Sequence, residues 1–239
     1  MSKVMADSSA LQYAREHHGF DRVWDTDPDT TFDFITTGEG TAVVTDGGGN
    51  GLLLTPSAGT VDNDEVYVDR EFETFKPASN TPSFCETMLA YTQKATNAGN
   101  LVNGFTDAVA ADLMQDNGGG PKTSGSFTLF YSKDGGLNWW VGISVSSTQT
   151  LVELTAANSL DKSAHEVGNS SNQILRIDLM PKPGNLCDVA FILDGVTVYK
   201  FMDWDISSIT DMQYVMGSKN GSTINETVTV YYSSAWQKR

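Results

Sequence analysis

Cysteine, histidine and positive charge are all scarce in this sequence. Two cysteines and three histidines occur in 239 residues. Cys85 and Cys187 lie far apart, which predicts two free thiols rather than a disulfide framework. His17, His18 and His165 have no spacing suited to zinc. With 15 basic residues against 30 acidic ones, the net charge of −15 repels phosphate backbones, so we expect no nucleic-acid partner.

Long apolar runs are also missing. No stretch approaches the roughly 20 apolar residues that a membrane-spanning helix needs. The first 20 residues lack the apolar centre of a secretory signal peptide. We therefore expect synthesis in a reducing cytoplasm and no membrane contact.

Motifs for nucleophilic catalysis and for phosphate binding are absent. The chain contains no Gly-x-Ser-x-Gly elbow, no phosphate-binding Gly-x-x-x-x-Gly-Lys loop and no Gly-x-Gly-x-x-Gly fingerprint. The glycine clusters at residues 47–51 and 118–120 have the composition of turns. The sequence therefore predicts no cofactor and no enzymatic activity.

One acidic segment has part of the pattern of a calcium-binding loop. Asp25, Asp27 and Asp29 have the required spacing, but Thr30 stands where the loop needs glycine and Thr36 where it needs glutamate. That pattern therefore fails, whereas Asp62, Asn63 and Asp64 could chelate calcium in a sandwich loop. We expect no metal site.

Alternation with a period of two is the main pattern that is present. Leu175, Ile177 and Leu179 alternate with polar residues, and a second alternating row ends at Asp194-Gly195. A period of two places successive side chains on opposite faces of a sheet. Asp-Gly favours a two-residue hairpin turn because such turns need φ > 0. Residues 174–201 are therefore predicted to form a three-stranded antiparallel meander.

About a dozen similar runs follow residue 34, separated by turn clusters. They predict an all-β, two-sheet antiparallel sandwich over residues 34–239. Residues 1–33 differ, with a short helical pattern followed by an acidic, irregular stretch, and are predicted to form an N-terminal arm. The Ala-rich segment 107–115 is interpreted as a loop.

Two local patterns suggest sugar chemistry. Asp69, Glu71 and Glu73 occupy alternate positions of one predicted strand, at roughly the separation that glycosidase carboxylates use. A solvent-exposed outer face is the interpretation we favour. Trp139 and Trp140 are consecutive, so one ring points inward and the other outward. The outward ring is a candidate to pack under a loop, to contact a protein or to stack on a sugar.

The order of several short pieces resembles the concanavalin-A-like (laminin-G-like) jelly-roll family, and within it proteins of tailed bacteriophages. The pieces span residues 34–233 and include Val61-Asp62-Asn63-Asp64, Phe75-Lys76-Pro77, Gly104-Phe105-Thr106-Asp107-Ala108, Leu175-Arg176-Ile177, Phe191-Ile192-Leu193-Asp194-Gly195 and Val228 to Tyr232. Glucanases of the laminarinase type share the fold, but their Glu-x-Asp strand motif is absent from this chain.

The resemblance implies a non-enzymatic virion protein, made in the host cytoplasm, that decorates the capsid surface as a cement protein. Its partner would be the major capsid protein, and we expect a homo-oligomer on the shell. The arm would clamp capsid subunits, and its removal would leave the sandwich folded. The alternatives are a glycan-binding module on a tail fibre or surface and, less favoured, a laminarinase-type hydrolase. The candidate partner-contacting residues are Tyr13, Phe20, Trp24, Phe32 and Trp140.

Overall fold

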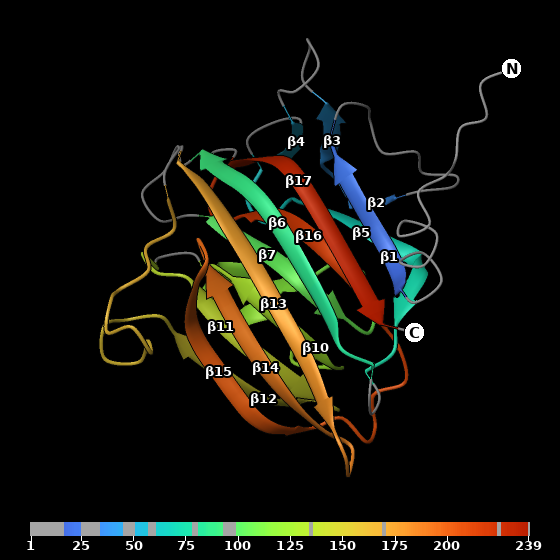
Figure 1. Cartoon of the computed structure of the whole chain (residues 1–239). Helices are drawn as coiled ribbons and strands as arrows, with labels where there is room; N and C mark the ends of the chain where they lie inside the picture. Colours follow the sequence, from blue (N-terminus) through green and yellow to red (C-terminus); the bar gives the residue numbers. More distant parts are fainter. Residues whose placement is uncertain are drawn as a thin grey trace, which may run out of the picture.

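The protein is a sandwich of two antiparallel β-sheets in a computed structural model (Figure 1). The structure describes residues 17–24, 34–44, 51–56, 61–77, 81–92, 99–133, 136–168, 171–223 and 226–238. In Figure 1 the larger sheet lies in front and the smaller sheet behind it. The all-β sandwich predicted from the sequence is therefore confirmed.

The larger sheet has eight strands and the smaller one has seven. In spatial order, the larger sheet contains β15 (Val196–Asp205), β14 (Leu186–Leu193), β13 (Asn172–Lys182), β6 (Ser83–Thr92), β17 (Thr227–Lys238), β4 (Leu52–Thr55) and β3 (Thr41–Val44), with β1 (His17–Val23) paired to β17. The smaller sheet contains β12 (Thr148–Glu153), β11 (Trp140–Val145), β10 (Phe127–Tyr131), β7 (Gly99–Thr106), β16 (Met212–Asn220), β5 (Glu65–Phe75) and β2 (Ile35–Gly38). A two-stranded ribbon of β8 (Met114–Gln115) and β9 (Gly120–Pro121) flanks the short 3-10 helix η1 (Asp116–Gly118).

The predicted meander is confirmed as β13, β14 and β15, which pair antiparallel in that order. The apolar row of β13 is buried, whereas Arg176 and Asp178 between its members are half-exposed. Asp194 and Gly195 have φ values of 50° and 81° and link β14 to β15. A turn with both central residues at positive φ matches the right-handed twist of the flanking strands.

The N-terminal boundary lies elsewhere than the sequence indicated. Strand β1 pairs in register with β17 from His17↔Lys238 to Val23↔Tyr232. Its backbone therefore extends the larger sheet, and residues 17–24 belong to the sandwich rather than to a separate arm. The division at residue 33 does not coincide with the edge of the sheet, because this strand is recognisable only from its partner at the other end of the chain.

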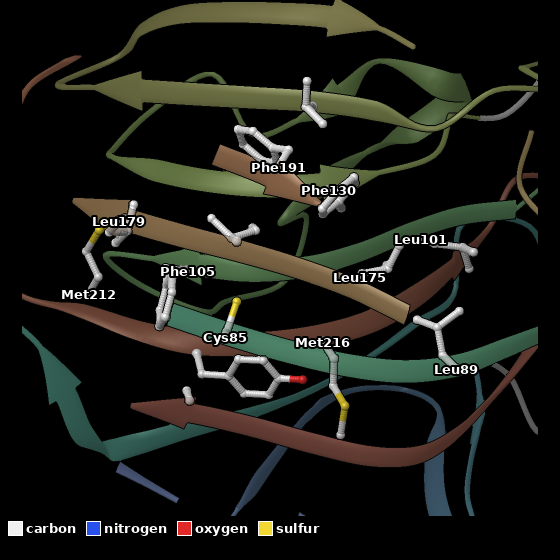
Figure 2. Close-up of a cluster of buried hydrophobic side chains, with 14 of the residues drawn as sticks. Cys85, Leu89, Leu101, Phe105, Phe130, Leu175, Leu179, Phe191, Met212 and Met216 are labelled. Atoms are coloured by element: carbon white, nitrogen blue, oxygen red, sulfur yellow. The ribbon is translucent and has the colours of Figure 1, made fainter. Parts of the chain in front are cut away.

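The main hydrophobic core fills the space between the two sheets (Figure 2). Figure 2 shows Phe130, Leu175 and Phe191 gathered with Cys85 and Met216 in this layer. Both cysteines are free, as predicted, and the structure buries them; burial raises the pKa of the Cys187 thiol to about 12. Within the described ranges, no helix is long and apolar enough to cross a membrane.

Candidate functional site

The seven-stranded sheet carries a second hydrophobic cluster on its outer face, turned away from the main core. Along β5 and β10, the members of this cluster alternate with residues of the main core, which places them on the opposite face of the sheet. The loop 107–126 contributes Leu113 and Met114 and lies over this face. The members are Tyr67, Val102, Leu113, Met114, Phe127, Leu129, Tyr131 and Val215. The segment 107–115 is thus a loop ending in β8, as predicted, and it fills the outer face.

A buried lysine fastens the loop to the sheet. Lys219 Nζ, with a side chain 1% exposed, lies 3.2 Å from Glu65 Oε2, 2.7 Å from Asp112 Oδ1 and 2.6 Å from Asp116 Oδ1. Glu65 also accepts hydrogen bonds from Tyr67 Oη at 2.9 Å and from the Asp112 amide at 2.7 Å. Because the two aspartates belong to the loop and the other groups to β5 and β16, this cluster closes the loop onto the sheet.

The protonation states of the cluster follow from burial and from charge. Burial raises the pKa of Glu65, although the Asp112 amide, Tyr67 and Lys219 oppose the shift. Burial alone would lower the pKa of the Lys219 ammonium, but hydrogen bonds to Asp112 and Asp116 and the charge of Glu65 outweigh it, and the pKa is raised. At neutral pH the lysine is therefore charged, and the ion pairs hold.

Asp69, the first residue of the predicted carboxylate row on β5, is not on the exposed face that the sequence predicted. Asp69 is 2% exposed and lies between Ile35 of β2 and Val215 of β16. The register between β5 and β16 shifts between Asp69 and Thr74, which interrupts the regular alternation on which the predicted spacing depends. The side chains of residues 71–73 lie outside the described part of the chain.

A surface depression of about 550 Å³ opens at the edge of the sandwich, beyond the covered part of the outer face. Trp140 of β11 and Glu153 of β12 are cross-strand partners in its wall. Asn158 donates from Nδ2 to the Glu153 carbonyl at 3.1 Å and closes one side. The remaining lining residues are Leu151, Val152, Ala157 and Tyr199. The depression thus combines two aromatic rings with a carboxylate and an amide.

Two buried polar atoms at this corner have no hydrogen-bond partner among the described residues. They are Trp140 Nε1 and Tyr131 Oη, from rings whose centroids lie 6.0 Å apart. Burial and the nearby charge of Glu153 raise the pKa of Tyr131, so its hydroxyl stays protonated at neutral pH. Lys133 Nζ lies 4.2 Å from the centroid of the Trp140 ring. Buried polar groups in folded proteins normally find partners, so these two atoms are exceptions at this corner.

A second depression, of about 270 Å³, lies on the outer face of the eight-stranded sheet. Phe84 and Trp236 form its aromatic wall, and Arg176 lies 4.7 Å from the centroid of the Phe84 ring. The Arg176 Nε donates to Asp178 Oδ1 at 2.7 Å, so its charge is already neutralised. Met180, 41% exposed, adds an apolar side chain at the rim.

The predicted partner-contacting residues separate into three groups. Tyr13 and Phe32 lie outside the described residues. Phe20 and Trp24 are 6% and 0% exposed, and both rings pack on Phe34 in the core, at 5.2 Å and 4.9 Å between centroids. The prediction that these two rings are free to contact a partner therefore does not match their place in the structure.

Trp140 is the predicted residue that does line a surface depression. Trp139, by contrast, points into the core and donates from Nε1 to Gln173 Oε1 at 3.0 Å. The sequence missed Glu153, Asn158 and Tyr199, because they come from three separate segments. Of the features at this depression, the Trp139-Trp140 pair was the one that the sequence singled out.

The candidate metal positions gain no geometric support. Across the described ranges, no group of three or more His, Cys, Asp and Glu residues is arranged to hold a metal ion. His165 pairs with Asp161, with 3.0 Å between Nε2 and Oδ1. Residues 25–29 lie outside the described part of the chain.

Comparisons with known proteins agree on the fold alone. No protein-family model matches the chain, and neither does any curated protein sequence. Solved structures do match. The carbohydrate recognition domain of Emp47p is 11% identical with a TM-score of 0.59, over 95% of this chain and 99% of that one. Lectin II from Ulex europaeus is 11% identical with a TM-score of 0.59, over 91% and 97%. An endo-β-1,4-glucuronan lyase from the fungus Trichoderma reesei is 11% identical with a TM-score of 0.55, over 91% and 94%.

These similarities define the class of fold. The protein has the concanavalin-A-like jelly-roll fold, as the sequence resemblance implied, and it shares this fold with the lectins that it matches. At 11% identity the likeness extends to the fold and not to the site.

Proposed function

We propose that this protein is a glycan-binding module and that the depression at Trp140 holds the sugar. The observation that carries the proposal is a half-buried indole beside the carboxylate of Glu153 and the amide of Asn158. A sugar ring presents an apolar face that stacks on an aromatic ring, and hydroxyls that pair with carboxylates and amides. The walls of the depression offer both kinds of group.

Two of the structural neighbours are named as a carbohydrate recognition domain and a lectin, which is in keeping with the proposal but rests on analogy.

We further propose binding without bond cleavage. Hydrolysis of a glycosidic bond by the usual route needs two carboxyl groups facing each other across the scissile bond. The lining of the Trp140 depression contains a single carboxylate, that of Glu153. Incubation with the bound oligosaccharide followed by chromatography should return the ligand uncut.

A glycan array followed by calorimetry tests the proposal. We expect Trp140→Ala to weaken binding of the best array ligand at least tenfold, or about 1.4 kcal/mol, with the fold intact by circular dichroism. Met180→Ala, at the rim of the other depression, is the matched control and should bind as the unmodified protein does. Absence of any array ligand counts against glycan binding, and equal affinity of Trp140→Ala counts against this site.

Capsid decoration, implied by the sequence resemblance, remains a second candidate function. The outer face of the eight-stranded sheet favours it, because apolar side chains are exposed there on β1 and β13. Val23 is 63% exposed, Met180 is 41% exposed and Ile174 is 38% exposed. Exposed apolar side chains that share one face with an aromatic-lined depression suit a protein surface as partner.

Cosedimentation with assembled phage shells tests this candidate. Truncation should stop at residue 16, because removal of residues 1–33 also deletes β1 and the buried Trp24 ring. If the face is the contact, Met180→Glu should abolish cosedimentation, whereas Trp140→Ala should not. Undiminished cosedimentation of Met180→Glu contradicts a role for this face.

A further inference from the structure

The charge in the lining of the depression at Trp140 is only negative. Its seven lining residues include one charged group, the carboxylate of Glu153, and no cationic side chain. Lys133 lies against the Trp140 ring but outside this lining. A ligand in the depression therefore meets the negative charge of Glu153 and no cationic side chain among the lining residues.

Glu153 is held in place and still has capacity to accept. Asn138 Nδ2 donates to its Oε1 at 2.9 Å, which fixes the carboxylate beside the cross-strand Trp140 ring. No described residue donates to Oε2. A carboxylate oxygen in this state accepts hydrogen bonds from sugar hydroxyls and repels another carboxylate.

We propose that the site selects neutral sugars and that Glu153 is the residue that excludes uronic acids; this rests on the glycan-binding function proposed above. Two carboxylates about 6 Å apart in a surface site repel each other enough to lower affinity roughly tenfold. The net charge of −15 adds a longer-range repulsion, which salt screens. Selectivity therefore combines an attractive contact to hydroxyls with a repulsive one to carboxylates.

The test compares two ligands that differ in one group. The probes are the neutral oligosaccharide that binds best on an array and the same oligosaccharide oxidised at C6 to the uronic acid. Calorimetry on the full chain should give at least tenfold tighter binding of the neutral probe. In Glu153→Gln, which keeps the Oε1 acceptor for Asn138, this ratio should fall below about threefold because the uronate probe binds more tightly.

Asp211→Asn is the matched control, since it removes one negative charge at an exposed position outside the depression. It should leave the ratio unchanged. The ratio in the unmodified protein should shrink in 0.5 M salt, where the Debye length of about 4 Å is shorter than the separation of the two carboxylates. If the uronate probe binds equally well or better, the inference is wrong while glycan binding stands. If Glu153→Gln lowers neutral binding without improving uronate binding, the selectivity role is also wrong. If neither probe binds, the glycan-binding function itself fails.

Discussion

Lys219→Met is the substitution for which the structure makes the sharpest stability prediction. The change removes the ammonium and leaves Glu65, 3% exposed, as an uncompensated buried charge. Removing one partner of a buried ion pair typically lowers the free energy of unfolding by about 3–5 kcal/mol. Glu65 keeps its hydrogen bonds from Tyr67 and from the Asp112 amide, so we expect the lower end, about 3 kcal/mol. Asp112 and Asp116, 70% and 51% exposed, return to water and add little.

The assay is reversible thermal and urea unfolding. For a chain of 239 residues, 1 kcal/mol shifts Tm by about 2–4 °C, so a loss of about 3 kcal/mol lowers it by about 6–12 °C. Lys122→Met is the matched control, because its partner Asp107 is a third exposed and the pair lies at the surface. We expect the control to cost less than about 1 kcal/mol. Adding Glu65→Gln to Lys219→Met should restore part of the loss, since no buried charge is then left unpaired.

At acidic pH, the difference in unfolding free energy between Lys219→Met and the unmodified protein should become smaller. The folded pKa of Glu65 is raised above its ordinary value of 4.5, so its contribution to stability is present below that value and is lost as pH rises through the folded pKa. Without the lysine the pKa rises further, and the stability deficit should be full at pH 7 and smaller near pH 4.5. A Tm change below 2 °C at pH 7, or a deficit no larger than that of Lys122→Met, would refute the role given to this lysine.

The remaining predictions concern the core, one turn and the thiols. Trp24→Ala should cost about 3–5 kcal/mol in urea unfolding because it empties a fully buried site; a loss below 1 kcal/mol would mean that β1 is dispensable. Gly195→Val should cost about 1–3 kcal/mol, since φ at this turn position is 81°, and an unchanged Tm would contradict the turn geometry. Cys85 and Cys187, both with pKa raised by burial, should react with a thiol reagent at pH 8 only after unfolding; fast reaction of the folded protein would contradict their burial.

The strands of the sandwich could be predicted from the sequence where a strand has one buried face and one exposed face. Strand β13 has this character, and its alternation predicted both the strand and the buried row. Strand β10 is buried on both faces, with Phe130 in the main core and Leu129 in the second cluster. Alternation did not reveal the loop that covers the outer side of β10, because it shows only that successive side chains face opposite ways.

The site was harder to predict because its parts meet only in three dimensions. Lys219 lies near the end of β16, buried against acids from β5 and the loop, and no short-range pattern in the sequence marks it as buried. The pair Trp139-Trp140 indicated one inward and one outward ring without saying which. Glu153 reaches Trp140 through strand pairing, which local sequence does not encode.

The position of β17 has a consequence for how the chain is made. This last strand is central in the eight-stranded sheet, flanked by β6 on one side and by β4 and β1 on the other. During synthesis, β1 and the β3–β4 hairpin have no sheet partner until residues 227–238 leave the ribosome. Because contacts between segments far apart in the sequence form slowly, β1, β3 and β4 are exposed to other chains until β17 has emerged. Ribosome-bound chains that stop before β17 should therefore be sensitive to protease across β1, β3 and β4.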